Sequence, residues 1–225
     1  MTDKLRITDR LDFLKSVCEG KKVLHLGCTN HPYTEQSIAD GMLLHDSLKE
    51  ISSSLYGFDF DPDGIGILER HGHSNLYEAD LENLDAVELE ETFDVIVAGE
   101  MIEHLNNPGR FLEGIQRFMD SETKLVITTV NAYSAMRLVM YAVSGKGGKN
   151  EPVHPDHVGY YSYSTLKLTV ERMGLRVSDF YFYDVGREHR PFVRKPYLWL
   201  NDAAVRFWPQ LSDGVIAVCQ AAREN

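Results

Sequence analysis

The sequence predicts an α/β fold built on a doubly wound, mostly parallel, seven-stranded sheet with helices on both faces. Short apolar runs alternate with amphipathic helical patterns, which is the arrangement that a parallel sheet requires. The first run, 22–26, ends in a turn at Gly27, and the second, 55–61, ends in the acids Asp59 and Asp61. Because a doubly wound sheet binds its ligand at the carboxyl ends of such strands, we expect one binding cleft there.

Length and composition favour a single domain over 1–225, with enough chain to bury a substantial core. The formal net charge of −11 argues against nucleic acid as a partner, since a protein that holds a phosphate backbone needs excess cations. Three cysteines, Cys18, Cys28 and Cys219, are typical of structural thiols in a reducing compartment. With no charged-then-apolar leader and no apolar run of membrane-spanning length, the sequence predicts a cytoplasmic protein.

In the first half of the chain, an amphipathic helix over 8–18, capped by Thr8 or Asp9, precedes the first strand. The helical pattern resumes only at 42–53, so residues 31–41 form an insertion before the crossover helix, and we expect this insertion to be a lid element. The elements that follow are a helix over 62–70, a strand over 75–78, a strand over 93–98, a helical turn over 101–105 and a helix over 108–119.

In the second half, the strand over 124–129 is almost continuously apolar or β-branched, which suits a central position in the sheet. The connection 186–213 shows no regular element and is the second expected lid element. Because this connection, and not a helix, separates the last two strands, we expect one of them to run antiparallel. The remaining expected elements are helices over 132–144 and 164–173, a flexible glycine-rich loop over 145–149, and strands over 175–183 and 214–219.

Four motifs occur in order at the ends of the first four predicted strands, namely Gly27, Asp59, Asp80 and Glu100. A tight turn in any α/β protein would explain the glycine alone, but it would not explain the ordered series. By this series the chain resembles the class I S-adenosylmethionine-dependent methyltransferases over residues 21–219.

The resemblance implies the Rossmann-like methyltransferase fold and S-adenosylmethionine as the cofactor. It also implies that the glycine turn lies beside the methionine part of the cofactor, that Asp59 holds the ribose hydroxyls, and that Asp80 with Leu81 binds the adenine edge. The stretch 93–105 is the most similar to the family, and its strand end is expected beside the reacting methyl group. The expected cofactor-binding residues are His25, Gly27, Cys28, Thr29, Asp59, Phe60, Asp80, Leu81, Gly99 and Glu100.

The sequence departs from the family at the first turn. Cys, Thr, Asn and His occupy 28–31, where glycines usually recur, and His25 stands where an acid near the cofactor's amino group is common. These changes keep open a degenerate module that binds the cofactor, or nothing, without catalysis. A nicotinamide cofactor fits less well, because Gly27 is a single glycine and Asp59 follows it 32 positions later.

The segment 100–104 is the strongest candidate for the chemistry. On a helix, positions i, i+3 and i+4 share a face, so we expect Glu100, Glu103 and His104 to converge. Two carboxylates and an imidazole suit Mg²⁺ or another divalent cation, which would lower the pKa of an acceptor hydroxyl.

This Glu-x-x-Glu-His pattern is similar to that of metal-dependent O-methyltransferases, which complete their metal site with a later histidine. His157, in the segment 154–157, is the expected counterpart. The alternatives are a metal-free site in which a histidine is the general base, and a His104 that only packs or caps locally. The expected catalytic residues are His104, His157 and Glu100, and the expected metal ligands are Glu100, Glu103, His104 and His157.

Tyrosines gather where an acceptor is expected, and we expect some of them to contact it and others to be core. They are Tyr133, Tyr141, Tyr160, Tyr161 and Tyr163.

The connection 186–213 is both basic and aromatic within an acidic chain. It would either capture a phosphate-bearing acceptor or contact an anionic membrane surface. The alternative, which we favour, is a solvated lid whose aromatics pack on the sheet or on the second subunit of a homodimer. Its cations are Arg187, Arg190, Arg194, Lys195 and Arg206, and its aromatics include Phe192, Tyr197, Trp199, Phe207 and Trp208.

The sequence therefore predicts methyl transfer from S-adenosylmethionine to a hydroxyl of a small-molecule or glycan acceptor. A glycan is included as a candidate acceptor class because the segment 103–108 is similar to the corresponding region of methyltransferases from secondary-metabolite and surface-polysaccharide pathways. Small-RNA 2′-O-methylation is the enzymatic alternative, disfavoured by the net charge of −11 and the lack of an extended basic face. Methylation of nitrogen or carbon stays open.

Overall fold

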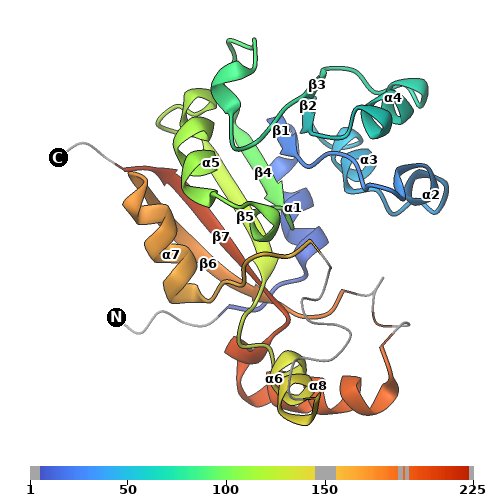
Figure 1. Ribbon diagram of the computed structural model, residues 1–225, viewed down its shortest axis with the longest axis vertical. Coiled ribbons are helices and arrows are strands. Elements are labelled where there is room, and N and C mark those ends of the chain that lie inside the picture. Colours follow the sequence, from blue (N-terminus) through green and yellow to red (C-terminus); the bar gives the residue numbers. More distant parts are fainter. Residues whose placement is uncertain (1–5, 145–155, 187–189, 191–192, 223–225) are drawn as a thin grey trace.

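The structure is a computed structural model that describes residues 6–144, 156–186, 190 and 193–222. Within these ranges, seven strands form one sheet in the order β3-β2-β1-β4-β5-β7-β6 (Figure 1). The predicted doubly wound, mostly parallel sheet is confirmed, and β7 is the strand that pairs antiparallel with both of its neighbours. The strands are β1 (Lys22–Leu26), β2 (Ser54–Asp59), β3 (Leu76–Glu78), β4 (Val95–Gly99), β5 (Lys124–Val130), β6 (Leu175–Tyr183) and β7 (Gly214–Ala221).

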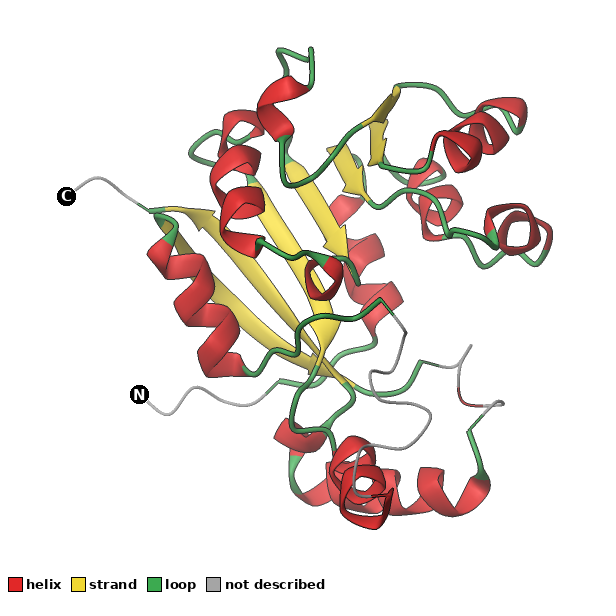
Figure 2. Ribbon diagram, viewed as in Figure 1, coloured by secondary structure: helices red, strands yellow, loops and turns green. Residues whose placement is uncertain are grey.

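Helices cover both faces of the sheet, as Figure 2 shows. Because side chains alternate along a strand, β1 sends Leu24 toward α5 and α7 and Val23 toward α1 and α3. The larger core lies on the side of α5 and α7, where Phe111 and Phe118 are fully buried. The helices are α1 (Arg10–Cys18), α2 (Thr34–Ala39), α3 (Leu44–Lys49), α4 (Pro62–Arg70), α5 (Pro108–Gly114), α6 (Ala135–Ser144), α7 (Tyr163–Arg172) and α8 (Lys195–Phe207), with 3₁₀ turns η1 (Leu84–Ala86), η2 (Ile102–His104), η3 (Ile115–Phe118) and η6 (Pro209–Leu211).

Several helix ends were predicted correctly from capping, proline and glycine residues in the sequence. The Asp9 side chain caps α1 by accepting from the Asp12 backbone N–H, and Pro62 begins α4 as predicted. Gly174 follows α7 with φ of 78°, a left-handed conformation that suits glycine.

The insertion 31–41 contains the short helix α2, and one prediction beside it needs correction, because the crossover helix α3 is shorter than the predicted 42–53. Leu43 and Leu68 pack with Cys28, so this region is joined to the first turn and to α4. Its role as a lid stays a prediction.

The connection 186–213 was predicted to be irregular, and this was wrong, because it contains α8 and η6. The large apolar residues Trp199 and Phe207 of α8 are exposed, so they do not mark the side of the helix that packs on the protein. Its buried residues, Asn201 and Val205, face the body of the protein, and α8 contacts α6 at the end of the molecule that Figure 1 shows at the bottom. The predicted loop 145–149 and residues His154, Arg187 and Phe192 lie outside the described residues.

The three cysteines are buried free thiols, in agreement with the prediction of structural cysteines. Over the described ranges, no helix combines the length and the apolar character needed to cross a bilayer. The cytoplasmic location stays a prediction.

Candidate active site

The turn after β1 brings the chain back against the end of β2. Gly27 adopts φ of 70°, which an L side chain rarely tolerates, and its N–H donates to the Phe58 carbonyl at 2.9 Å. The Thr29 N–H donates to Asp59 Oδ2 at 2.8 Å, so the carboxylate holds the turn in place. The thiol of Cys28 is fully buried, and therefore only the backbone of this residue can face a ligand.

Asp59 ends β2 and organises the loops around it. Its Oδ1 accepts the Asp61 N–H at 3.0 Å, and because each carboxylate oxygen has two lone pairs, ribose hydroxyls can still donate to it. The neighbouring Phe60 side chain is 73% exposed, which leaves its ring free to stack on a base. Ala79 N–H donates to the Asp59 carbonyl, and this contact brings the predicted adenine pair, Asp80 with Leu81, beside the same strand end.

The end of β4 lies next to β1, at the position where the strand order reverses direction. There Glu100 adopts φ of 55°, and its Oε1 accepts from the Tyr183 hydroxyl at 2.5 Å and from Thr128 Oγ1 at 3.0 Å. Arg10, from α1, donates to Thr128 Oγ1 at 3.0 Å and lies 3.7 Å from Glu100 Oε1. No local sequence signal marks Arg10 or Tyr183, because these residues reach the end of β4 from distant parts of the chain.

Glu103, His104 and His157 form an acid–imidazole group beside this strand end. One ligand atom from each lies within 4.8 Å of the others, and the two imidazole centroids are 4.6 Å apart. The Glu103 carbonyl accepts from the Val158 and Gly159 N–H groups, which ties the later histidine to η2.

The Glu103 carboxyl is fully buried within this group. Its Oε2 accepts from Thr129 Oγ1 at 2.8 Å, and its buried Oε1 has no hydrogen-bond partner among the described residues. Burial, reinforced by the charge of Glu100, raises the pKa of Glu103 well above that of an ordinary carboxyl. The site therefore favours the neutral carboxyl unless a cation binds beside it.

The prediction that Glu100, Glu103 and His104 share one helix face is wrong. The segment forms a 3₁₀ turn that begins at Ile102, and the left-handed conformation of Glu100 directs its carboxylate to Tyr183 instead. The structure thus brings together three of the four expected metal ligands, and Glu100 lies outside that group.

His25 has no exposed face toward the strand ends. Its ring is 2% exposed, and its Nδ1 lies 3.2 Å from Nδ1 of His45 on α3. Burial lowers the pKa of His25 to about 3, so the imidazole is neutral.

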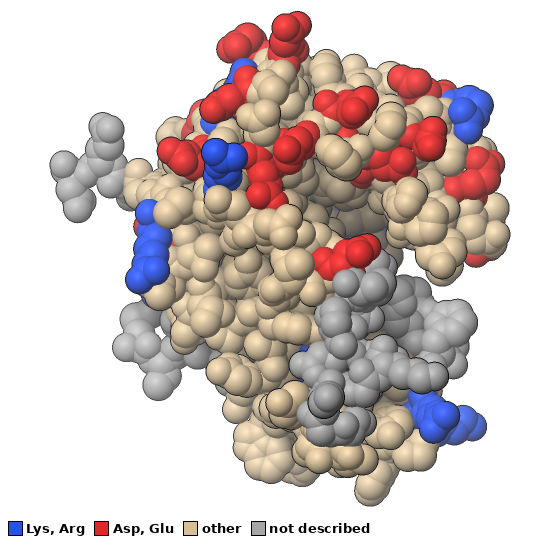
Figure 3. Space-filling view, in the orientation of Figure 1, with Lys and Arg blue, Asp and Glu red and all other residues tan. Residues whose placement is uncertain are grey.

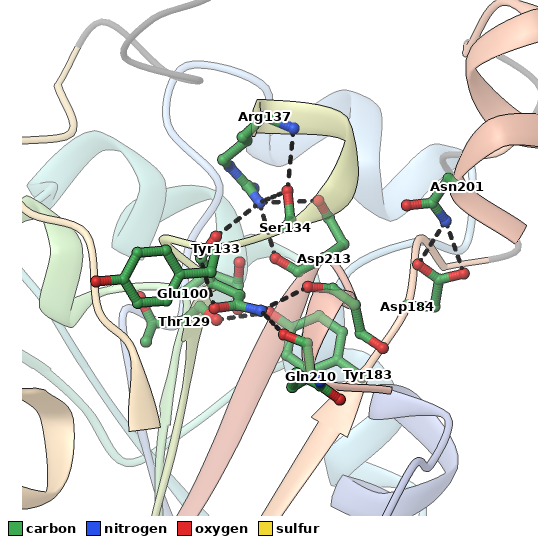
Figure 4. A network of polar contacts seen from close by, with 12 residues as sticks. Glu100, Thr129, Tyr133, Ser134, Arg137, Tyr183, Asp184, Asn201, Gln210 and Asp213 are labelled. Carbon is green, nitrogen blue, oxygen red and sulfur yellow. Dashed lines mark hydrogen bonds and ion pairs between the residues drawn. The ribbon is translucent and has the colours of Figure 1, made fainter. Parts of the chain in front are cut away.

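A polar network near Glu100 anchors the end of the molecule that α6 and α8 form (Figure 4). Arg137 of α6 forms an ion pair with Asp213 at 2.9 Å, and Asn201 of α8 donates to both oxygens of Asp184. Burial raises the pKa of Asp213, and Arg137 opposes that shift. These contacts attach α6 and α8 to the ends of β6 and β7.

The expected acceptor tyrosines separate into two groups. Tyr133 and Tyr141 are exposed and Tyr160 lies near His157, whereas Tyr161 is core and Tyr163 packs on Phe180.

Among the cations of 186–213, Arg190 is engaged within the protein, because its Nη2 donates to both oxygens of Asp202. On the face shown in Figure 3, acidic side chains gather on the upper part, and none is visible around α6 and α8 at the lower end.

The comparisons with known proteins agree on one protein family. Residues 4–179 match a family model described as Methyltransferase domain. The chain is 26% identical over 141 residues to a mitochondrial ubiquinone biosynthesis O-methyltransferase of Schizosaccharomyces pombe, and 25% identical over 120 residues to a ubiquinone biosynthesis O-methyltransferase of Glaesserella parasuis. These matches cover 58% and 50% of this chain and 47% and 46% of the relatives, so the chain spans about half the length of both.

Among solved structures, a SAM-dependent methyltransferase from Archaeoglobus fulgidus superposes with a TM-score of 0.60 at 20% identity. The match covers 94% of this chain and 91% of that one. At this identity the likeness concerns the fold alone.

Proposed function

Since the chain belongs to the Methyltransferase domain family and carries an S-adenosylmethionine-dependent methyltransferase domain, we propose that it methylates a hydroxyl group of a small-molecule or glycan acceptor. The observation that carries this proposal is the acid–imidazole group of Glu103, His104 and His157 beside the end of β4. A hydroxyl must lose its proton to accept a methyl group, and imidazole is the side chain best matched to that task near pH 7.

The cofactor would lie across the ends of β2, β1 and β4. Asp59 would accept from the ribose hydroxyls, Phe60 would stack on the adenine, and the Gly27 turn would lie against the methionine part. The acceptor oxygen attacks the methyl carbon in line with the sulfonium, so the C–O bond forms as the C–S bond breaks. The hydroxyl proton passes to His104 or His157, and S-adenosylhomocysteine leaves.

As an alternative to the histidine base, the donor set also fits a divalent cation. A buried Glu103 oxygen without a partner, next to two imidazoles, would be satisfied by a metal ion held by Glu103, His104 and His157. One oxygen and two nitrogen ligands favour a transition-metal ion such as Mn²⁺ over Mg²⁺, which prefers oxygen. Such an ion would supply positive charge that lowers the pKa of the acceptor hydroxyl.

The names of the relatives favour a small hydroxylated molecule as acceptor, whereas the glycan rests on the resemblance of residues 103–108. The pairing of Arg190 with Asp202 weakens the prediction that this arginine captures a phosphate. Small-RNA methylation is the alternative, and the acidic composition counts against it. Membrane contact and a homodimer stay predictions.

The test begins with calorimetric titration of the protein with S-adenosylhomocysteine, followed by transfer of labelled methyl from S-adenosylmethionine to a panel of phenols, sugars and a small RNA. Once an acceptor is found, His104→Gln and His157→Gln are compared with His71→Gln, which removes an exposed imidazole that pairs with Glu35 on the surface.

Loss of the general base should lower kcat by roughly 10²-fold or more, while the dissociation constant of S-adenosylhomocysteine stays unchanged. The His71→Gln control should keep wild-type kcat. Binding of the cofactor product without transfer to any hydroxyl acceptor would favour the degenerate module, and wild-type kcat in both site variants would reject these histidines as the base.

A further inference from the structure

We propose that Glu100 is the carboxylate that binds the α-ammonium group at the amino-acid end of the cofactor, and that Tyr183 is the positioning residue that holds it there. This inference rests on the proposed function in one respect, namely that S-adenosylmethionine occupies the ends of the central strands. It adds a recognition role for Glu100 and a positioning role for Tyr183.

The position of Glu100 suits the amino-acid end. β2, β1 and β4 are neighbours in the sheet, and a cofactor whose ribose is held by Asp59 at the end of β2 extends its other end across Gly27 toward β4. Glu100 is the first residue after β4, and its side chain is 35% exposed. A ligand that lies on the turn therefore reaches this carboxylate.

The hydrogen bonds of Glu100 leave one oxygen available. Over the described part of the chain, the bonds from Tyr183 and Thr128 both end on Oε1. The backbone is fixed as well, because the Glu100 N–H donates to the Thr128 carbonyl at 3.0 Å. With Oε1 held and the residue locked in a left-handed conformation, Oε2 is presented in a defined direction for a charged donor.

Tyr183 reaches Glu100 by crossing β7. Tyr183 is paired in register with Gly214, and a Cβ placed on that glycine would lie 2.0 Å from Cζ of the tyrosine ring. Only glycine therefore leaves room for the ring at this position. The ring is almost fully buried, and the hydroxyl donates a hydrogen bond to Glu100 (Figure 4).

The charge around Glu100 matches a zwitterion. Arg10 lies 3.7 Å from Glu100 Oε1, and its Nη2 is 3.1 Å from the position that a Cβ would occupy on Gly99. A cation and an anion thus stand side by side at the end of β4, both of them partly exposed. The amino-acid end of the cofactor carries one ammonium and one carboxylate, so each of its charges meets an opposite charge.

Other acids described near these strand ends are engaged elsewhere. Glu103 is fully buried in the acid–imidazole group, and Asp213 forms an ion pair with α6. Asp184 accepts two hydrogen bonds from α8, and both oxygens of Asp59 accept backbone N–H groups. By comparison, Glu100 is 35% exposed, and its described hydrogen bonds end on one oxygen, so the other can accept from an ammonium group.

The experiment compares two probes by calorimetry on the full chain. S-adenosylhomocysteine carries the amino-acid end, and 5′-methylthioadenosine lacks it but keeps the adenine, ribose and sulfur. The variants are Glu100→Gln and Tyr183→Phe. The control is Tyr181→Phe, which also removes one phenolic hydroxyl, here from an exposed contact with Arg6.

Wild-type protein should bind S-adenosylhomocysteine about tenfold or more tightly than 5′-methylthioadenosine, since a charge-assisted hydrogen bond separates the two. Glu100→Gln should remove most of that preference and leave the affinity for 5′-methylthioadenosine unchanged. Tyr183→Phe should reduce the preference about threefold to tenfold. Because Tyr183 would act through Glu100, Tyr183→Phe should have little further effect when Glu100→Gln is already present.

Equal weakening of both probes would overturn the inference, because it would indicate a structural role. An unchanged preference in Glu100→Gln, or no preference in the wild type, would also overturn it. If the preference behaves as expected but no acceptor hydroxyl is methylated, the O-methylation proposal fails while this assignment holds. If the wild type binds neither probe, the cofactor site itself is rejected, and this inference with it.

Discussion

His25, His45 and His73 form a buried row between β1, α3 and the approach to β3, and we expect this row to make folding sensitive to acid. The His25 and His45 rings stack with their Nδ1 atoms 3.2 Å apart, so one Nδ1 donates and the other accepts. The accepting ring must therefore be neutral, and burial disfavours a charge on the donating ring as well. His73 lies beside His45 and is paired with Asp46 at 2.7 Å, which partly opposes the lowering of its pKa.

Burial lowers the pKa of His25 to about 3 and that of His45 to about 2, and Arg10 and Lys49 contribute to these shifts. In the unfolded chain both groups bind protons near pH 6.5, whereas the folded protein does not. The free energy of unfolding therefore falls as pH drops below 6.5, down to the folded pKa values. When the pH falls from 8 to 5, each of these two imidazoles should lower the free energy of unfolding by about 2 kcal/mol.

The perturbation is His45→Phe, which removes the titrating group but keeps a ring between His25 and α3. Urea unfolding at pH 8 and pH 5 gives the pH difference in free energy for each protein. This difference should be smaller in His45→Phe than in the wild type by about 2 kcal/mol. The comparison uses a difference of differences, so a constant packing loss cancels, as does the opposite pH trend that Glu103 contributes.

Leu48→Ala is the matched control, because it removes a fully buried side chain from the same helix without removing a proton-binding site. It should lower stability by a similar amount at both pH values. If the pH difference of His45→Phe equals that of the wild type, the buried row does not take up protons on unfolding. A reduced pH difference in Leu48→Ala would mean that packing, and not protonation, sets the trend.

Three further outcomes are expected. Asp59→Asn should weaken the binding of S-adenosylhomocysteine, measured by calorimetry, roughly tenfold or more, because it removes the charge that accepts from the ribose and from the Thr29 N–H. An unchanged affinity would reject the ribose role of Asp59. Mn²⁺ should raise the melting temperature of the wild type but not of Glu103→Gln or His157→Gln, and an equal rise in all three would place the ion elsewhere. Arg137→Met should lower the free energy of unfolding by about 3 kcal/mol, because it leaves the Asp213 carboxylate buried and unpaired. Adding Asp213→Asn should recover part of this loss. No recovery in the double variant would contradict the ion-pair explanation.

Predictions that depend on local pattern agreed well with the structure. The apolar run at 22–26 is β1, and Pro62 with the pattern after it gives α4 over Pro62–Arg70. A strand or a helix start is encoded within a few residues, because backbone sterics and capping act over that range. The cofactor motifs Gly27 and Asp59 could be located for the same reason, since each ends a predicted strand.

The helix α8 was missed because its stability depends on distant residues. It contacts α6, whose residues precede it by about sixty positions, and Asn201 is buried through its bonds to Asp184. The exposed Trp199 and Phe207 hid the usual amphipathic pattern. Tertiary contacts, and not local periodicity, decided this element.

By itself, the sequence determined the fold class, the succession of the seven strands along the chain, and the positions of Gly27, Asp59 and Glu103. Only the tertiary structure decided which side chains meet. It turned the Glu100 carboxylate to Tyr183 instead of into the group of Glu103, and it brought Arg10 and Tyr183 to the end of β4 from distant parts of the chain. The physical reason is that strand identity is a short-range property of the chain, whereas convergence depends on sheet order, on register and on the space that a single glycine leaves across a neighbouring strand.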